Sequence, residues 1–430
     1  MLRTGFFAPH GEVNILFTDV EGDAIIEAST IVDVALGQNG TWSIADQLRG
    51  KIYTYDEQGN LLYVFGDKTQ AALLGGIDTV ISMVYNETDL LVYDKTVEAF
   101  TVYKRTEYGD LIAAALQNQR DRNYSEAVTY WRQILQSNSN FDQAYVGIGD
   151  SLYRAGKYEE AMEQYKYAHA IENYSEAFRN VRQVWLESYI IVVPIVLIIF
   201  FLLLSKLFKY ANKVNLEGQV TKEHRTWKEA TCYAFHVMLH PFDGFWDLKH
   251  EKRGNLRGAF TIIGLTLIAM IYKSIGTAYI FDPENQGGSI IGTIVSVLLP
   301  FILWAVANWC LTTLFDGEGS FRDIVIATGY ALMPLPLFII PTTMITNVLT
   351  LEESAIVSLL YSLGYIWCGF LIFFGAMVTH DYSMSKNILT SLGTLVGIAL
   401  IMFICVLFTG LLAKVFSFVY NLVVELAIRL

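Results

Sequence analysis

The chain has 430 residues, of which 53% are hydrophobic and 17% charged, and its formal net charge is −12. This composition is too apolar for an entirely soluble protein, yet it leaves enough charge for a sizeable water-soluble part. Residues 1–187 hold 15 basic and 27 acidic side chains and no cysteine. The first part therefore has no disulfide framework, and its acidity argues against nucleic acid or anionic lipid as a partner.

Residues 1–109 are predicted to form strands and turns. Three similar runs end in Asp19, Asp56 and Asp94, at spacings of 37 and 38 residues. Each aspartate ends an alternating apolar run and begins a turn, where its carboxylate can accept backbone amide bonds. A period near 40 with paired strands is typical of propeller blades. Residues 50–66, which read GKIYTYDEQGNLLYVFG, resemble NHL-type propeller repeats.

A closed propeller needs about four to eight blades, and residues 1–109 contain only two to three such units. We therefore expect that further blades precede this chain, come from another subunit, or have been lost. Residues 1–20 also show no secretory signal peptide, which favours an incomplete start.

Residues 110–187 are predicted to be helical hairpins. The run NYSEA at Asn123–Ala127 recurs as KYEEA at Lys157–Ala161, an offset of 34 residues, and each is followed by an aromatic residue four positions later. This pattern resembles tetratricopeptide repeats (TPR), whose small residues let paired helices approach. The resemblance implies a concave surface for a peptide or protein partner, although a simple helical spacer is an equal alternative. No cluster of basic residues in the sequence identifies a ligand.

Residues 188–207 are predicted to be a transmembrane anchor, because Ser188–Ser205 is uncharged and just long enough to span. Residues 208–253 are predicted to be a basic linker containing an amphipathic helix that lies on the inner leaflet. Ten basic residues between 206 and 257 indicate that this segment is cytoplasmic. Residues 1–187 are then expected outside the cytoplasm. If the start of the chain is complete, a cytoplasmic position for these residues is the rival expectation.

Residues 254–430 are predicted to be a block of five membrane-spanning helices. Each run is long enough to cross the hydrocarbon as a helix, and four of the five contain no charged residue. We expect a multi-pass protein of the cell membrane with its C-terminus outside. The five runs are Gly258–Phe281, which contains Lys273, Gly288–Phe315, Ile324–Val348, Ala355–Val378 and Asn387–Ala413.

Three short motifs in this block resemble the Yip1 family: HPFDG at His240–Gly244, DGEGSFRD at Asp316–Asp323 and GYALMP at Gly329–Pro334. In eukaryotes the family implies trafficking adaptors that bind small GTPases. Because a propeller and TPR part before the block looks bacterial, we do not extend the GTPase role to this chain. The resemblance identifies a candidate cytoplasmic interface motif, which consists of His240, Pro241, Asp243 and Gly244.

The span over residues 324–348 is the most informative one, because prolines interrupt it. Each proline removes a backbone donor, and broken helices can frame a solute or ion site, although a kink that only shapes packing is favoured. Lys273 could mark a polar path, but snorkelling to the outer surface is favoured. The candidate membrane-core or partner positions are Lys273, Asp316, Arg322, Gly329, Tyr330, Pro334, Pro336 and Pro341.

No catalytic site, cofactor site or metal site is predicted. His236 and His240 are four residues apart with Asp243 and Asp247 following, but the glutamate of a His-Glu-x-x-His site is absent. Neither a nucleophile elbow nor a phosphate-binding loop is present.

The sequence thus predicts a multidomain membrane protein with partial propeller-like repeats, TPR hairpins and an all-α polytopic bundle. We interpret it as a non-enzymatic scaffold or adaptor whose extracytoplasmic repeats bind a protein partner or envelope component. The alternative is a transporter subunit or permease that moves a solute along the proline-broken helix 324–348. The expected partners are the lipid bilayer, a protein bound by the repeats or the membrane block, and, as a further candidate, a membrane transport complex.

Overall fold

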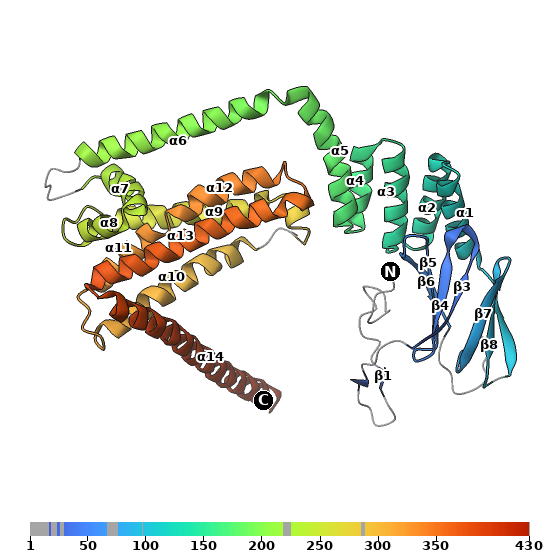
Figure 1. The fold of residues 1–430 in the computed structure, drawn as a ribbon. Helices are drawn as coiled ribbons and strands as arrows, with labels where there is room; N and C mark the ends of the chain where they lie inside the picture. The colour runs from blue at the N-terminus through green and yellow to red at the C-terminus, as the bar shows by residue number, and fades with distance from the viewer. Residues whose placement is uncertain are drawn as a thin grey trace. The chain divides into compact units, whose positions relative to one another are not determined.

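The computed structural model divides the chain into two compact units, Met1–Gln183 and Val184–Leu430 (Figure 1). It describes residues 17–18, 24–25, 30–66, 76–96, 98–217, 225–284 and 289–429. The first unit combines small antiparallel sheets with helical hairpins, and the second is helical.

Antiparallel strands make up the sheets of the first unit. β1 (Phe17–Thr18) pairs with β2 (Ala24–Ile25). A four-stranded sheet has the order β3 (Ile31–Leu36), β4 (Trp42–Asp46), β5 (Lys51–Tyr55) and β6 (Leu61–Phe65), with the short helix η1 (Gln38–Gly40) between β3 and β4. A three-stranded sheet follows in the order β7 (Val80–Asn86), β8 (Asp89–Asp94) and β9 (Ala99–Tyr103).

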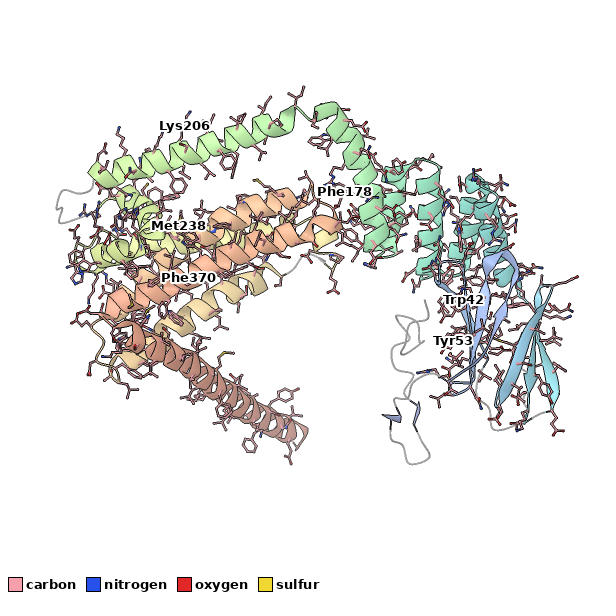
Figure 2. All side chains as sticks on the ribbon, viewed as in Figure 1. Trp42, Tyr53, Phe178, Lys206, Met238 and Phe370 are labelled. Atoms are coloured by element: carbon pink, nitrogen blue, oxygen red, sulfur yellow. The ribbon has the colours of Figure 1, made fainter. Side chains whose placement is uncertain are left out.

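The two larger sheets share a core because alternate side chains of a strand point to one face. Ile52 and Leu90, which are 0% and 2% exposed, belong to one buried cluster that contains residues of both sheets. On the four-stranded sheet, Trp42 stacks on Tyr55 with ring centroids 4.6 Å apart, and Tyr53 is buried in the same cluster (Figure 2).

The strand-ending aspartates make the turn contacts expected of them. The carboxylate of Asp56 accepts backbone amide bonds from Gln58 and Asn60 at 2.9 and 2.8 Å. Asp94 likewise accepts from the amide of Thr96 at 2.8 Å. Asp19, which ends the first of the three runs, lies outside the described residues. The described sheets are too few to close a propeller, so that assignment stays a prediction.

Five helices complete the first unit, and each of the first four packs on its neighbour in sequence (Figure 1). Small residues at the contacts let neighbouring helices pack closely, as the 34-residue pattern predicts. Ala127 and Ala161 are both fully buried. The bounds are α1 (Glu107–Arg120), α2 (Tyr124–Ser137), α3 (Asp142–Arg154), α4 (Tyr158–Tyr167) and α5 (Ile171–Tyr189), of which α5 crosses the boundary between the units.

The described part of the second unit contains six helices that are long and apolar enough to cross a membrane, so the chain is a multi-pass membrane protein. The expected boundaries after residues 187 and 207 fall inside helices, because α5 continues to Tyr189 and α6 to Glu217. The last helix, α14, continues to Arg429. The bounds are α6 (Val192–Glu217), α7 (Trp227–Leu239), α8 (Pro241–Lys249), α9 (Leu256–Gly276), η2 (Tyr279–Phe281), α10 (Ile290–Thr312), α11 (Phe321–Ala331), α12 (Pro334–Thr346), η3 (Leu351–Glu353), α13 (Ser354–His380) and α14 (Met384–Arg429).

The centre of the second unit is the broken span α11–α12. Its most apolar 18-residue window is 78% buried, against 33% or less in each of the other five spans. α7 packs into the same core, and Tyr233 and Val237 are 1% and 0% exposed. The apolar face of α7, which the sequence placed against the inner leaflet, is therefore covered by protein.

Candidate functional site

The first unit contains a polar groove of about 460 Å³ between its four-stranded sheet and its helices. Helices α1, α2 and α3 form one wall, and η1 and the β5–β6 turn form the other. The repeat pattern of residues 110–187 implied a concave surface on the helices, whereas this groove also has a wall from η1 and the β5–β6 turn. Its polar lining consists of Asn39, Asp56, Glu57, Gln58, Gln119, Arg120, Arg122, Tyr124, Gln143, Asp150 and Arg154.

Three arginines line this groove, although the sequence showed no basic cluster. Arg120 pairs with Glu57 at 3.0 Å. Arg122 and Arg154 are exposed, and neither has a carboxylate partner among the described residues. Arg154 follows Arg120 by 34 residues, so the repeat offset was a signal that could have brought these two positions together.

The carboxylates of the groove already have partners within the unit. The carboxylate of Asp56 accepts from its own turn, and Glu57 binds Arg120. The hydroxyl of Tyr165 donates to Asp150 at 2.8 Å. Burial raises the pKa of Asp150, and the bond from Tyr165 partly offsets this effect. Arg122 and Arg154 form no ion pair within 4.0 Å in the described part of the chain, although the charge of Arg154 also acts on Asp150. Their guanidinium groups suit a ligand that carries carboxylates.

In the second unit, two of the family-like motifs lie at one end of the bundle, which we call the His380 end. It comprises α8, the α10–α11 turn and the end of α13. Lys249 at the end of α8 forms a 2.8 Å ion pair with Glu318 of the turn. Hydrogen bonding to Lys249 lowers the pKa of Glu318 below its ordinary value. The ion pair therefore joins the helix that begins at Pro241 to the Asp316–Asp323 motif.

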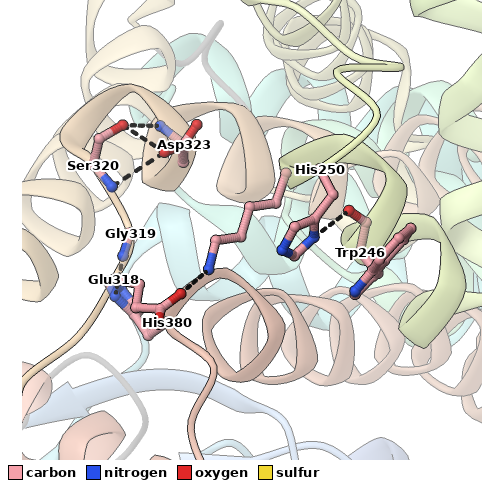
Figure 3. A network of polar contacts seen from close by, with 8 residues as sticks. Trp246, His250, Glu318, Gly319, Ser320, Asp323 and His380 are labelled. Atoms are coloured by element: carbon pink, nitrogen blue, oxygen red, sulfur yellow. Dashed lines mark hydrogen bonds and ion pairs between the residues drawn. The ribbon is translucent and has the colours of Figure 1, made fainter. Parts of the chain in front are cut away.

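The side chain of His380 holds the α10–α11 turn through a hydrogen bond to its backbone (Figure 3). The backbone amide of Gly319 donates to Nδ1 of His380 at 3.2 Å. Nε2 must then carry the proton, and it donates to Oδ1 of Asn308 at 2.7 Å. His380 is 2% exposed, so these two bonds satisfy both nitrogens of a buried neutral imidazole. No motif in the sequence pointed to His380.

The candidate residues of the first two motifs divide into structural and exposed positions. Gly244 is buried, and a β-carbon there would lie 2.7 Å from Cα of Val237, so glycine lets α7 and α8 meet. Pro241 occupies the first turn of α8, where its missing amide costs nothing. The remaining motif positions His240, Asp243, Asp316 and Arg322 are all exposed.

Gly329 and Tyr330 lie in the core, where α11 meets α9 and α7. A β-carbon on Gly329 would lie 2.9 Å from Cβ of Ala259 on α9. Tyr330 is fully buried, and its hydroxyl donates to the carbonyl oxygen of Ala230 on α7 at 2.7 Å. These two candidates therefore hold the bundle together at its most buried span.

The proline break between α11 and α12 satisfies most of its own polar groups. The backbone amides of Leu332, Met333 and Leu335 donate to carbonyls three residues earlier. Pro334 and Pro336 lie in the first turn of α12, where amides have no partner within the helix. Pro341 is inside the helix and is the proline that removes an interior bond. This geometry fits a packed kink.

The two histidines considered for metal binding lie side by side. The rings of His236 and His240 stack with centroids 4.8 Å apart, and burial lowers the pKa of His236. Asp247 is engaged elsewhere, because it accepts a bond from Tyr233 and lies 3.6 Å from Arg253. In the part of the chain that the structure describes, no group of three or more metal-ligating side chains is found.

The candidate Lys273 lies at the opposite end of the bundle, in the last turn of α9. This Lys273 end also contains the starts of α10 and α13. The lysine is half-buried beside a cavity of about 610 Å³, with its ammonium 4.3 Å from the ring centroid of Tyr361. The structure thus places it apart from the two motifs of the His380 end.

Comparison with known proteins identifies the membrane block. Residues 235–419 match the family model of the Yip1 domain. This range contains all three of the motifs that carried the resemblance. A search of curated proteins finds no match to the chain.

Proposed function

For a multi-pass membrane protein whose residues 235–419 form a Yip1 domain, we propose the function of a non-enzymatic scaffold or adaptor. Its first unit would bind a protein partner, and its membrane unit would hold that partner at the bilayer. Proteins with this domain are generally non-catalytic membrane proteins, which supports the non-enzymatic part of the proposal.

The observation that carries this proposal is the groove of the first unit with Arg122 and Arg154, which form no ion pair with any carboxylate that the structure describes. Arginine binds carboxylates through two parallel hydrogen bonds, and glutamine side chains can bond the backbone of an extended chain. Gln143 lines the same groove. The side-chain amide of Gln119 already donates to the carbonyl of Gly147 and the hydroxyl of Ser151. The proposed ligand is therefore an extended protein segment that carries acidic side chains or a C-terminal carboxylate.

The orientation of the protein belongs to the same proposal. Ten basic residues between 206 and 257 favour a cytoplasmic position for that segment, which places the groove on the other side of the membrane. A partner would then be an extracytoplasmic protein or envelope component. Single cysteines placed in the first unit, which has none, would test this with a membrane-impermeant thiol reagent.

Transport along residues 324–348 receives less support. A solute path through a broken helix needs backbone groups that are free to bind the solute. Here the amides of the break already donate to carbonyls of the preceding turn. The purified protein in proteoliposomes should therefore show no flux of ions or small solutes above that of empty vesicles. A reproducible flux abolished by Pro341→Ala would favour the transporter instead.

A photo-crosslinking experiment tests the proposed groove. A benzoylphenylalanine residue in place of Gln143 would line the groove, whereas the same residue in place of Arg132 would be exposed on α2 outside it. Irradiation of native membranes should give a specific crosslinked protein from position 143. Combining it with Arg122→Glu and Arg154→Glu should abolish that product, because reversed charges repel a carboxylate.

The control is Arg132→Glu in the same crosslinking background, which changes the net charge without changing the groove. This variant should retain the crosslinked product. Equal products from positions 143 and 132, or a product that survives both charge reversals in a folded protein, would rule out the groove as the binding site.

A further inference from the structure

The cavity at the Lys273 end combines charged side chains and hydroxyl groups. The last turn of α9, η2 with Asp282, the start of α10 and the start of α13 line it. Its polar lining includes Lys273, Asp282, Thr293, Ser354, Ser358 and Tyr361. A site with these groups is suited to a polar ligand that carries charge.

The ammonium group of Lys273 is held in place without an ion pair. It lies 4.3 Å from the ring centroid of Tyr361 and 5.8 Å from that of Tyr365. No carboxylate of the described residues lies within 4.0 Å of it. Aromatic faces attract a cation and restrict its position but leave its three hydrogen-bond donors available. Lys273 can therefore donate to an anion that enters the cavity.

Asp282 provides the opposite charge in the same cavity. It follows η2 in the connection between α9 and α10 and is half-buried. Its field acts on Lys273, but the two groups do not form an ion pair. A separated cation and anion in one cavity match a ligand that carries both charges at a fixed distance.

The surroundings of the cavity place it at the depth of lipid headgroups. α9 ends three residues after Lys273, and α10 and α13 begin beside it. The ends of spanning helices lie where hydrocarbon gives way to the polar interface. Ile275, Ile291 and Ile356 lie near this end with 64%, 74% and 49% of their surfaces exposed. They form apolar surface on which acyl chains can pack.

We propose that this cavity binds the headgroup of an aminophospholipid. The ammonium of Lys273 binds the lipid phosphate, with hydroxyls of Thr293, Ser354 and Ser358 as further donors. The carboxylate of Asp282 binds the ammonium group of the lipid. This inference does not depend on the groove of the first unit.

Native mass spectrometry of the full-length protein in detergent tests the proposal. The probes are a short-chain phosphatidylethanolamine, a phosphatidylglycerol of the same chain length and inorganic phosphate. Lys273→Met, which keeps the apolar stem, should weaken phosphatidylethanolamine binding about tenfold, the loss expected for one charge-assisted hydrogen bond. Asp282→Asn should weaken the binding of phosphatidylethanolamine but leave the binding of phosphatidylglycerol unchanged, because only phosphatidylethanolamine carries an ammonium group.

Two variants serve as controls. Lys386 also lies over a tyrosine ring, 4.9 Å from the centroid of Tyr382, but does not line this cavity, so Lys386→Met should bind lipid like the wild type. Lys273→Arg keeps the charge and should retain most of the binding. Equal affinities of Lys273→Met and the wild type would overturn the proposal, as would equal losses in Lys273→Met and Lys386→Met. Competition by inorganic phosphate at the lipid's own concentration would overturn the lipid assignment.

Discussion

The hydroxyl of Tyr330 donates a 2.7 Å hydrogen bond to the backbone carbonyl of Ala230, one hundred residues earlier in the chain. Tyr330 belongs to the most buried span, and Ala230 belongs to a helix that the sequence placed on the membrane surface. Both residues are 0% exposed. The bond therefore fixes α7 inside the bundle, where a polar group without a partner would destabilise the fold.

Gly258→Ala should destabilise this contact. A β-carbon at position 258 would lie 2.4 Å from the hydroxyl oxygen of Tyr330 and 3.2 Å from Cβ of Ala230. One of these groups must move, which costs about 1–3 kcal/mol in a packed core. The measurement is thermal unfolding of the purified protein in detergent, and the melting temperature should fall.

The matched control is Gly264→Ala on the same helix, α9. A β-carbon there would have no heavy atom within 4 Å, and alanine favours helix more than glycine does. This variant should melt at or above the wild-type temperature. Similar melting temperatures for the two variants would contradict the proposed packing of Tyr330.

His380→Ala should loosen the turn between α10 and α11. The imidazole accepts the amide of Gly319 and donates to Asn308, so its removal leaves both groups without these bonds. Hydrogen exchange at residues 317–320 should become faster. His250→Ala is the control, because His250 is exposed and contacts Trp246 on its own helix. Equal exchange in both variants would show that His380 does not hold the turn.

Asp150→Asn should change how stability depends on pH. Burial raises the pKa of Asp150 above its ordinary value of 3.8, so folding favours the neutral acid. Its contribution to stability is therefore full below 3.8 and is lost as the pH rises through the raised pKa. Asparagine stays neutral and can still accept from Tyr165, so the variant should lose less stability between acidic and neutral pH.

The comparison for Asp150→Asn is Glu163→Gln, an exposed substitution on α4. Thermal unfolding should be followed in buffers from below pH 3.8 up to neutrality. The pH profile of Glu163→Gln should match that of the wild type. An Asp150→Asn profile parallel to the wild type would disprove the role assigned to burial.

Gly147→Ala should destabilise the helical hairpins of the first unit. A β-carbon there would lie 2.4 Å from the indole ring of Trp131, which is 1% exposed and has little room to move. The expected cost is about 1–3 kcal/mol. In a Trp131→Leu background the same substitution should cost less, because the ring is gone. A double-mutant cycle by denaturant unfolding measures this difference, and zero coupling would contradict the contact.

Much of the architecture was readable from local pattern. Uncharged runs of spanning length predicted the membrane helices, and the HPFDG, DGEGSFRD and GYALMP motifs predicted the Yip1 domain that residues 235–419 match. The 34-residue offset predicted packed hairpins in which Ala127 and Ala161 are buried. These features depend on hydropathy, periodicity and residue size within short windows, which one sequence contains in full.

The sequence by itself determined that the chain enters a membrane and that a unit of strands and helices precedes the spans. Only the tertiary structure decided that α7 is covered by protein, that Lys249 meets Glu318 across 69 residues, and that Arg122 and Arg154 share one groove. Hydropathy is a sum over neighbouring residues, so a linear reading can evaluate it. Which side chains share an ion pair or a cavity depends on how distant segments pack, and no local window contains that information.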